Sequence, residues 1–155
     1  DDCDFCSVKH WPFSWREFMS RLPYDWDCLQ VAIINPRKLI ANIHPRYVDD
    51  FSTACFVVNR RYAEKLMHFH CRDDRFKLDN GVRPRAVADD LIYNAGKTYA
   101  IPLFLYKLEL GSSIHPEHID AFHKTSREGL DHWWKNQSAD MPINKFFEYD
   151  THELY

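Results

Sequence analysis

The spacing of apolar residues predicts two helices in the first half of the chain. Ser14 and Glu17 have the S-x-x-E spacing of a capping box, and apolar residues then recur at helical intervals until Pro23 ends the pattern. Asn59 is a typical N-cap residue, and the apolar residues behind it share one helical face. Helices are therefore expected over 14–22 and 60–70.

Shorter apolar runs predict strands. Consecutive apolar positions from Cys28 to Ile34 are typical of a strand buried on both faces. The run from Phe51 to Val58 is rich in β-branched and aromatic residues, which favour strands. Further extended segments are expected over 38–43, 98–101 and 103–108, the last two separated by Pro102.

Two more helices complete the pattern. A short helix is expected over 87–95, with Gly96 placed to end it, and a longer one over 116–135. The chain beyond is polar with isolated aromatic residues, which predicts an extended tail that either packs on another part of the protein or is partly loose. Because strands alternate with helices, the sequence predicts an α/β domain over 1–135 and a tail over 136–155.

Composition excludes several classes of protein. The 20 Lys and Arg residues face 23 Asp and Glu, for a formal net charge of -3, which argues against binding to nucleic acid or to anionic membranes. The 4 glycines lie too far apart to share a phosphate-binding loop. The longest apolar stretch, 28–34, is much shorter than the roughly 20 residues of a membrane span.

The start of the chain and its cysteines suggest a cellular context. The chain begins at Asp1 rather than at Met, and no signal-peptide pattern follows. The 5 cysteines are an odd number, which favours a reducing compartment over a disulfide framework. We therefore expect a piece of a longer cytoplasmic protein.

Acidic residues at the start of the chain are candidate metal ligands. Asp1, Asp2 and Asp4 lie within four positions, and alternate residues of an extended segment point the same way. Asp2 and Asp4 could therefore converge on one hard cation, for which carboxylate oxygens are suitable ligands. The alternative is a solvated acidic terminus.

Asp89 and Asp90 form a second acidic pair, next to the apolar residues of the short helix. A carboxylate in such a setting can serve as a general base with a tuned pKa. The alternative is a pair of acidic residues in a first helical turn, where the helix dipole favours them.

Three histidines follow one another as H-x2-H-x4-H at the start of the last helix. They are His115, His118 and His123, and their spacing does not give the i, i+4 pair of a preformed zinc site. His115, just before a proline, is the best placed to be a single ligand from a loop. Otherwise such histidines lie on the surface or cap the helix.

Taken in order, these segments resemble glycosyltransferase family 25, the lipopolysaccharide and procollagen galactosyltransferases. Residues 1–5 (DDCDF) resemble the acidic metal motif of the family, and residues 24–30 (YDWDCLQ) resemble its W-D-x-x-x-L segment. Five further segments resemble motifs of the family in the same order. They are STACFVVNR at 52–60, AEKL at 63–66, ADD at 88–90, YAIP at 99–102 and SSI at 112–114. The first βαβ unit of the family has no counterpart here, nor does 115–155 have one in the family.

The resemblance implies a partial GT-A fold, a Rossmann-like mixed sheet flanked by helices. It implies transfer of a hexose from a nucleotide sugar, most simply a UDP-sugar, to the hydroxyl of a glycan, a lipid-linked or a protein acceptor. The transfer would depend on Mn²⁺ or Mg²⁺ and would invert the anomeric carbon.

The resemblance also implies roles for individual residues. Asp2 and Asp4 would hold the metal, with Asp1 in support and His115 completing the shell. Asp90 is the first choice for the base that deprotonates the acceptor, and Asp89 the second.

Two other classes of function remain open from the sequence. A metal-dependent phosphoester hydrolase would use the same carboxylates together with the three histidines. A non-catalytic carbohydrate-binding module would use the many aromatic residues, 11 Phe, 8 Tyr and 5 Trp, as stacking surfaces for sugar rings.

Overall fold

The computed structural model describes residues 2–76, 87–108 and 117–148. Its strands are β1 (Cys3–Asp4), β2 (Cys28–Ala32), β3 (His44–Pro45), β4 (Phe56–Val58), β5 (Cys71–Arg72), β6 (Arg75–Phe76) and β7 (Thr98–Tyr106). Its helices are α1 (Trp15–Ser20), α2 (Arg60–His70), α3 (Ala88–Tyr93) and α4 (Lys124–Asn136), with the 3-10 turns η1 (Cys6–His10), η3 (Ser138–Asp140) and η4 (Ile143–Phe147) and the π-helical turn η2 (Ile119–His123).

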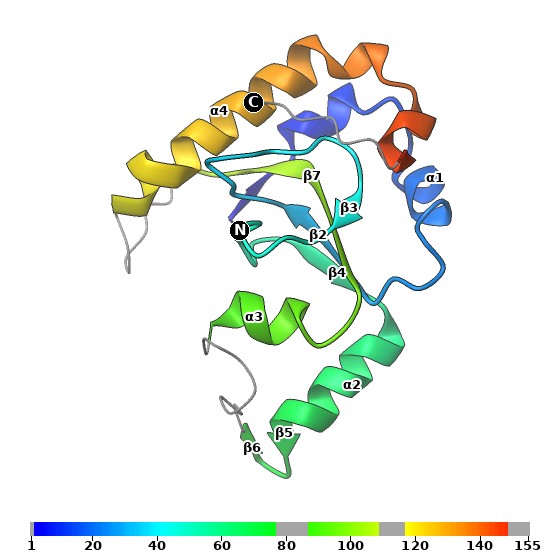
Figure 1. Ribbon diagram of the computed structural model, residues 1–155, viewed down its shortest axis with the longest axis vertical. Helices are drawn as coiled ribbons and strands as arrows, with labels where there is room; N and C mark the ends of the chain where they lie inside the picture. The colour runs from blue at the N-terminus through cyan, green and yellow to red at the C-terminus, as the bar shows by residue number, and fades with distance from the viewer. Residues whose placement is uncertain (1, 77–86, 109–116, 149–155) are drawn as a thin grey trace.

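The main sheet is mixed, in the order β1-β7-β2-β4, and β3 pairs with β7 beside it. Strands β2 and β7 are parallel, whereas β1 and β4 run antiparallel to their neighbours. Helices α1 and α4 lie on one side of the sheet and α2 and α3 on the other (Figure 1). The expected α/β class, with a mixed sheet flanked by helices, is therefore confirmed.

Each side of the sheet has its own apolar core. The larger core packs Phe18 of α1 and Leu130 of α4 against alternate residues of β2, among them Leu29 and Val31. The smaller core joins Cys28, on the opposite face of β2, to Tyr62 of α2 and Tyr93 of α3. Strand β2 is thus buried on both faces, as its run of apolar residues predicts.

Both N-cap side chains predicted from local sequence make their hydrogen bonds, although the Glu17 carboxylate of the predicted capping box pairs with Arg21. The Ser14 hydroxyl accepts a hydrogen bond from the Glu17 backbone N–H at 3.2 Å, and α1 begins at the next residue. The Asn59 side chain accepts one from the Tyr62 N–H at 2.7 Å, and α2 spans the predicted 60–70. These caps depend only on residues within one turn, so the sequence alone determines them.

Four predicted extended segments differ from the structure. Segment 38–43 forms no strand, although its centre is buried. Of the strand predicted over 51–58 only β4 forms, because Ser52 takes a φ of 100°, which no strand accommodates. The two segments around Pro102 form one strand, β7, whose register against β2 is irregular at that point. An irregular pairing suits Pro102, which has no N–H to donate.

Gly96 follows α3, as predicted, but its role differs from that of a C-cap. A Cβ at this position would lie 2.4 Å from the Tyr62 ring and 2.6 Å from the Asp27 carboxylate. Glycine is therefore required by close packing between the α3 turn and α2. Helix α3 itself ends two residues earlier than expected, at Tyr93.

The described part of the predicted tail, residues 136–148, packs into the larger core and is not extended. Residues 138–147 fold into η3 and η4, and Met141 and Phe146 are buried among the aromatic residues of α4. The predicted apolar face of the last helix holds at Leu130, Trp133 and Trp134. The prediction is wrong for Phe122, which lies on the π-helical turn and is 39 % exposed. No helix in the described ranges is long and apolar enough to cross a bilayer.

Candidate functional site

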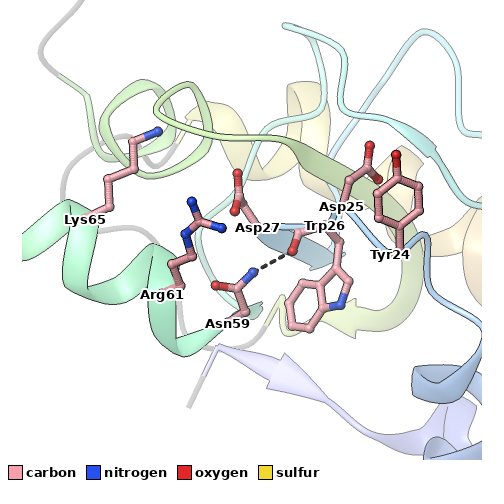
Figure 2. A pocket seen from close by; sticks show the side chains of 7 residues that line it. All are labelled: Tyr24, Asp25, Trp26, Asp27, Asn59, Arg61 and Lys65. Atoms are coloured by element: carbon pink, nitrogen blue, oxygen red, sulfur yellow. Dashed lines mark hydrogen bonds between the residues drawn. The ribbon is translucent and has the colours of Figure 1, made fainter.

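Two polar cavities lie at opposite edges of the main sheet. One, of about 620 Å³, lies where β2 begins and is called here the amino-edge cavity (Figure 2). The other, of about 230 Å³, lies where the parallel strands β2 and β7 end and is called the carboxyl-edge cavity. Its lining consists of Asp2, Ile34, Phe51, Ser52, Thr53, Ala54, Asp89, Tyr106 and His123. Open α/β sheets bind ligands beyond the carboxyl ends of their strands, so this second cavity is the candidate site.

Asp89 projects into the carboxyl-edge cavity from the first turn of α3. Its Oδ1 accepts a hydrogen bond from the Ser52 N–H at 2.8 Å, and its side chain is 22 % exposed. The Arg46 guanidinium lies 3.9 Å from the same oxygen. These contacts hold Oδ1 and fix the direction of the carboxylate, while Oδ2 has no partner among the described residues. Asp89 can therefore accept a proton from a bound molecule.

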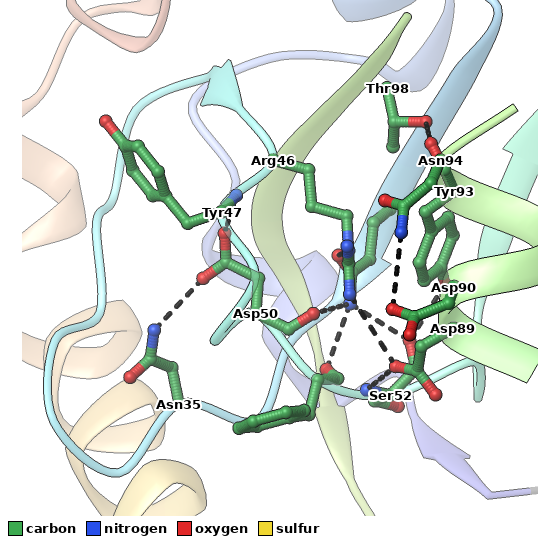
Figure 3. A network of polar contacts seen from close by, with 12 residues as sticks. Asn35, Arg46, Tyr47, Asp50, Ser52, Asp89, Asp90, Tyr93, Asn94 and Thr98 are labelled. Atoms are coloured by element: carbon green, nitrogen blue, oxygen red, sulfur yellow. Dashed lines mark hydrogen bonds and ion pairs between the residues drawn. The ribbon is translucent and has the colours of Figure 1, made fainter. Parts of the chain in front are cut away.

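Arg46 is a buried cation behind Asp89 (Figure 3). Only 4 % of its side chain is exposed. Its Nε donates to Gln30 Oε1 at 3.2 Å, and its guanidinium lies 4.6 Å from the centre of the Tyr93 ring. Its Nη2 has no hydrogen bond among the described residues. A buried guanidinium is costly unless it is paired, so the pairing with Asp89 holds both groups in place.

Gln30 ties this network to the loop that carries Ser52. The Gln30 amide nitrogen donates to the carbonyls of Asp50, Phe51 and Ser52 at 3.1, 2.9 and 2.9 Å. The Tyr93 hydroxyl donates to the Ser52 carbonyl as well, at 2.8 Å. Such contacts can maintain the left-handed φ of Ser52, a costly conformation for a residue with a Cβ. The strained residue directs its N–H at Asp89.

The structure separates the two members of the predicted acidic pair. Asp90 is 1 % exposed, does not line the carboxyl-edge cavity, and accepts from the Asn94 side chain at 3.3 Å (Figure 3). Asp89, the second choice for a general base, is the one that reaches the cavity. Successive residues of a helix point about 100° apart, so only one of the pair can face a given side.

The predicted metal pair, Asp2 and Asp4, is also separated. Asp2 lines the carboxyl-edge cavity, but Asp4 does not. Asp4 Oδ2 forms an ion pair with Arg127 of α4 at 2.8 Å, and its Oδ1 accepts from the Cys6 N–H at 2.9 Å. Because β1 begins only at Cys3, the strand alternation that would align Asp2 with Asp4 does not extend to Asp2.

The described residues provide only part of the predicted metal shell. Asp1 and His115 lie outside these ranges, and Asp4 is committed to Arg127. Within residues 2–76, 87–108 and 117–148, no group of three or more His, Cys, Asp or Glu side chains could hold a metal ion. Asp2 is the one predicted ligand that the structure places in the cavity.

His123 adds an imidazole to the cavity from the π-helical turn η2. Its ring lies 4.6 Å from that of Tyr106, edge to face, and its buried Nδ1 has no hydrogen bond within the described part of the chain. Burial, with a smaller contribution from His118, lowers the pKa of His123 below its usual 6.5. A neutral imidazole at this position can donate or accept a hydrogen bond.

The Asp4–Arg127 pair predicts how the stability of the fold depends on pH. The Arg127 hydrogen bond is the largest cause that lowers the pKa of Asp4 below its usual 3.8. The stabilisation is therefore complete above pH 3.8 and is lost as the pH falls through the lower pKa of the folded state. We expect Arg127→Gln to lower the free energy of unfolding by about 1 kcal/mol at pH 7, and by less at pH 2.5.

Urea unfolding at the two pH values measures this difference. Lys124→Gln, an exposed charge change one turn earlier on α4, is the matched control and should show no such pH dependence. An equal loss in Arg127→Gln at both pH values would contradict the assigned role of the pair.

Sequence reasoning missed Arg46 and Ser52. Gln30 is noticeable in the sequence because it interrupts an otherwise apolar run, and a polar residue inside a buried strand needs partners. No pattern in the sequence marks Arg46. It lies in a loop, where the direction of a side chain cannot be predicted from periodicity. The strain at Ser52 depends on contacts from β2 and α3, which no local pattern reveals.

The comparisons with known proteins found no match from which a family could be assigned. The chain matches no protein-family model, no curated protein and no solved structure.

Proposed function

We propose that the chain forms part of an inverting glycosyltransferase of the GT-A type, which moves a hexose from a UDP-sugar to a hydroxyl acceptor. The single observation that carries the proposal is that Asp2 and Asp89 line one cavity at the carboxyl edge of the sheet. The family resemblance assigns these residues to the donor side and to proton removal. They are 87 positions apart in the sequence, and only the fold brings them together.

Asp89 performs the acid–base step in this proposal. The acceptor oxygen attacks the anomeric carbon as the bond from that carbon to the diphosphate oxygen breaks. The electron pair of that bond leaves with UDP, and the hydroxyl proton passes to Asp89 Oδ2. A single displacement of this kind inverts the anomeric carbon. The Ser52 N–H and Arg46 keep Oδ1 occupied, so that Oδ2 remains the basic oxygen.

A divalent cation, Mn²⁺ or Mg²⁺, is part of the proposal. When bound, it would stabilise the negative charge that develops on the leaving diphosphate. Asp2 is the ligand that lies in the cavity, and the resemblance adds Asp1 and His115. Asp4 is not proposed as a ligand, because both of its oxygens already have partners.

Thermal melting with UDP, with Mn²⁺ and with both tests the donor side of this site. A ligand at 100 times its Kd raises the free energy of unfolding by about 2.7 kcal/mol, so a rise in Tm that needs both ligands is expected. Asp2→Ala should abolish this rise. Asp4→Asn is the matched control, and it should lower the starting Tm yet keep the rise.

The assignment of Asp2 as a metal ligand would be contradicted if Asp2→Ala still showed the rise in Tm. It would also be contradicted if Asp4→Asn abolished the rise to the same extent. Hydrolysis of p-nitrophenyl phosphate in the presence of Mn²⁺ would instead favour the phosphoester hydrolase, to which His123 could contribute from the same cavity.

A further inference from the structure

The amino-edge cavity lies at the opposite end of β2 from the site proposed for sugar transfer. It measures about 620 Å³ and is lined by Tyr24, Asp25, Trp26, Asp27, Asn59, Arg61 and Lys65 (Figure 2). Its side chains come from the segment before β2 and from the first turns of α2. None of them lines the carboxyl-edge cavity, so the two cavities can act independently.

Two aromatic rings lie along the amino-edge cavity. Trp26 is half-buried and packs partly against the larger core, which holds the ring in place. Its backbone carbonyl accepts a hydrogen bond from the Asn59 side chain at 2.6 Å, drawn as a dashed line in Figure 2. Tyr24 is fully exposed, at 101 %. A fully exposed aromatic ring beside an anchored one provides a surface on which a flat ligand can stack.

Some of the charged groups that line this cavity are already paired, and others are not. Asp25 is already paired with Lys97 and accepts from the Tyr99 hydroxyl at 3.0 Å. Asp27 Oδ2 accepts the Lys97 N–H at 2.9 Å. Across the cavity, the Arg61 guanidinium points toward Asp27 (Figure 2). Arg61 has neither a hydrogen-bond nor an ion-pair partner within the described residues, so its N–H groups are available to a ligand.

We propose that the amino-edge cavity binds a neutral oligosaccharide. The apolar C–H face of a sugar ring suits the negative faces of Trp26 and Tyr24. Adjacent hydroxyls suit the guanidinium fork of Arg61 and the remaining oxygen of Asp27, which donate and accept respectively. The carboxylates of Asp25 and Asp27 line the cavity beside the two cations, so a phosphate or nucleotide would meet like charge there as well as opposite charge. This binding site stands whether or not the chain transfers sugars.

The test is binding of the full chain to an array of neutral hexose and N-acetylhexosamine oligosaccharides, in EDTA and without UDP. Tyr24→Ala should weaken binding about tenfold, and because the ring is fully exposed the fold should not change. Arg61→Ala should weaken it similarly. Phe76→Ala removes a ring that is 82 % exposed outside the cavity, and it should leave binding unchanged.

Three results would overturn the proposal. The first is that no neutral oligosaccharide binds. The second is that Phe76→Ala weakens binding as much as Tyr24→Ala does. The third is that UDP or inorganic phosphate binds through Arg61 while the neutral glycans do not. Because the assay excludes UDP and Mn²⁺, its failure is distinct from failure of the proposed sugar transfer.

Discussion

Replacing Asp89 with asparagine should lower the turnover of sugar transfer by about 10²- to 10⁴-fold, the usual contribution of a general base. The amide keeps the size of the carboxylate and can still accept the Ser52 N–H, but it cannot take the acceptor proton. UDP release from a UDP-hexose in the presence of an acceptor measures turnover. The rise in Tm with UDP and Mn²⁺ should persist, since this side chain acts in the chemical step rather than in donor binding.

Asp90→Asn is the matched control, one residue along the same helix. Asp90 is buried and bonded to Asn94, so its substitution should lower Tm and have much less effect on turnover in the folded protein. If Asp90→Asn is still folded and loses as much turnover as Asp89→Asn does, the assignment of the base to Asp89 is wrong. Equal turnover in Asp89→Asn and the unmodified chain would exclude a general base at this position.

Local sequence patterns predict the elements of this fold better than they predict its candidate site. The capping residues Ser14 and Asn59 and the buried strand β2 depend on neighbours within a few positions. Each is present, although β2 ends at Ala32 rather than at the predicted Ile34. The candidate site depends instead on the direction in which individual side chains point. Only the packing of the six-residue helix α3 decides whether Asp89 or Asp90 faces the carboxyl-edge cavity.

The limits of periodicity are also visible at Asp4 and in the last helix. Alternation places Asp2 and Asp4 on one face only if both belong to the strand, and Arg127, 123 positions away, draws Asp4 toward α4. Similarly, the π-helical turn before α4 shifts the helical phase, which leaves Phe122 exposed. Long-range contacts of this kind leave no local signal.

Composition predicts an extended tail after residue 136, but its described part, up to residue 148, forms two packed 3-10 turns. Polar residues dominate there, yet Phe146 is 0 % exposed. Its ring lies 6.0 Å from that of Trp134, nearly parallel, and 5.0 Å from that of Phe13, edge to face. The Phe146 carbonyl accepts the Ile43 N–H at 2.8 Å. One buried aromatic residue can therefore anchor a segment that is otherwise polar.

Phe146→Ala should consequently lower the free energy of unfolding by about 3–5 kcal/mol, the cost of removing a buried phenyl group and leaving a cavity. Small domains have only about 5–15 kcal/mol in total, so the loss should be visible as a marked fall in the urea midpoint. Phe76→Ala, which removes an exposed ring, should change stability by no more than about 0.5 kcal/mol. Similar midpoints for the two variants would mean that the η4 segment does not pack into the core, and that the 1–135 portion carries the fold by itself.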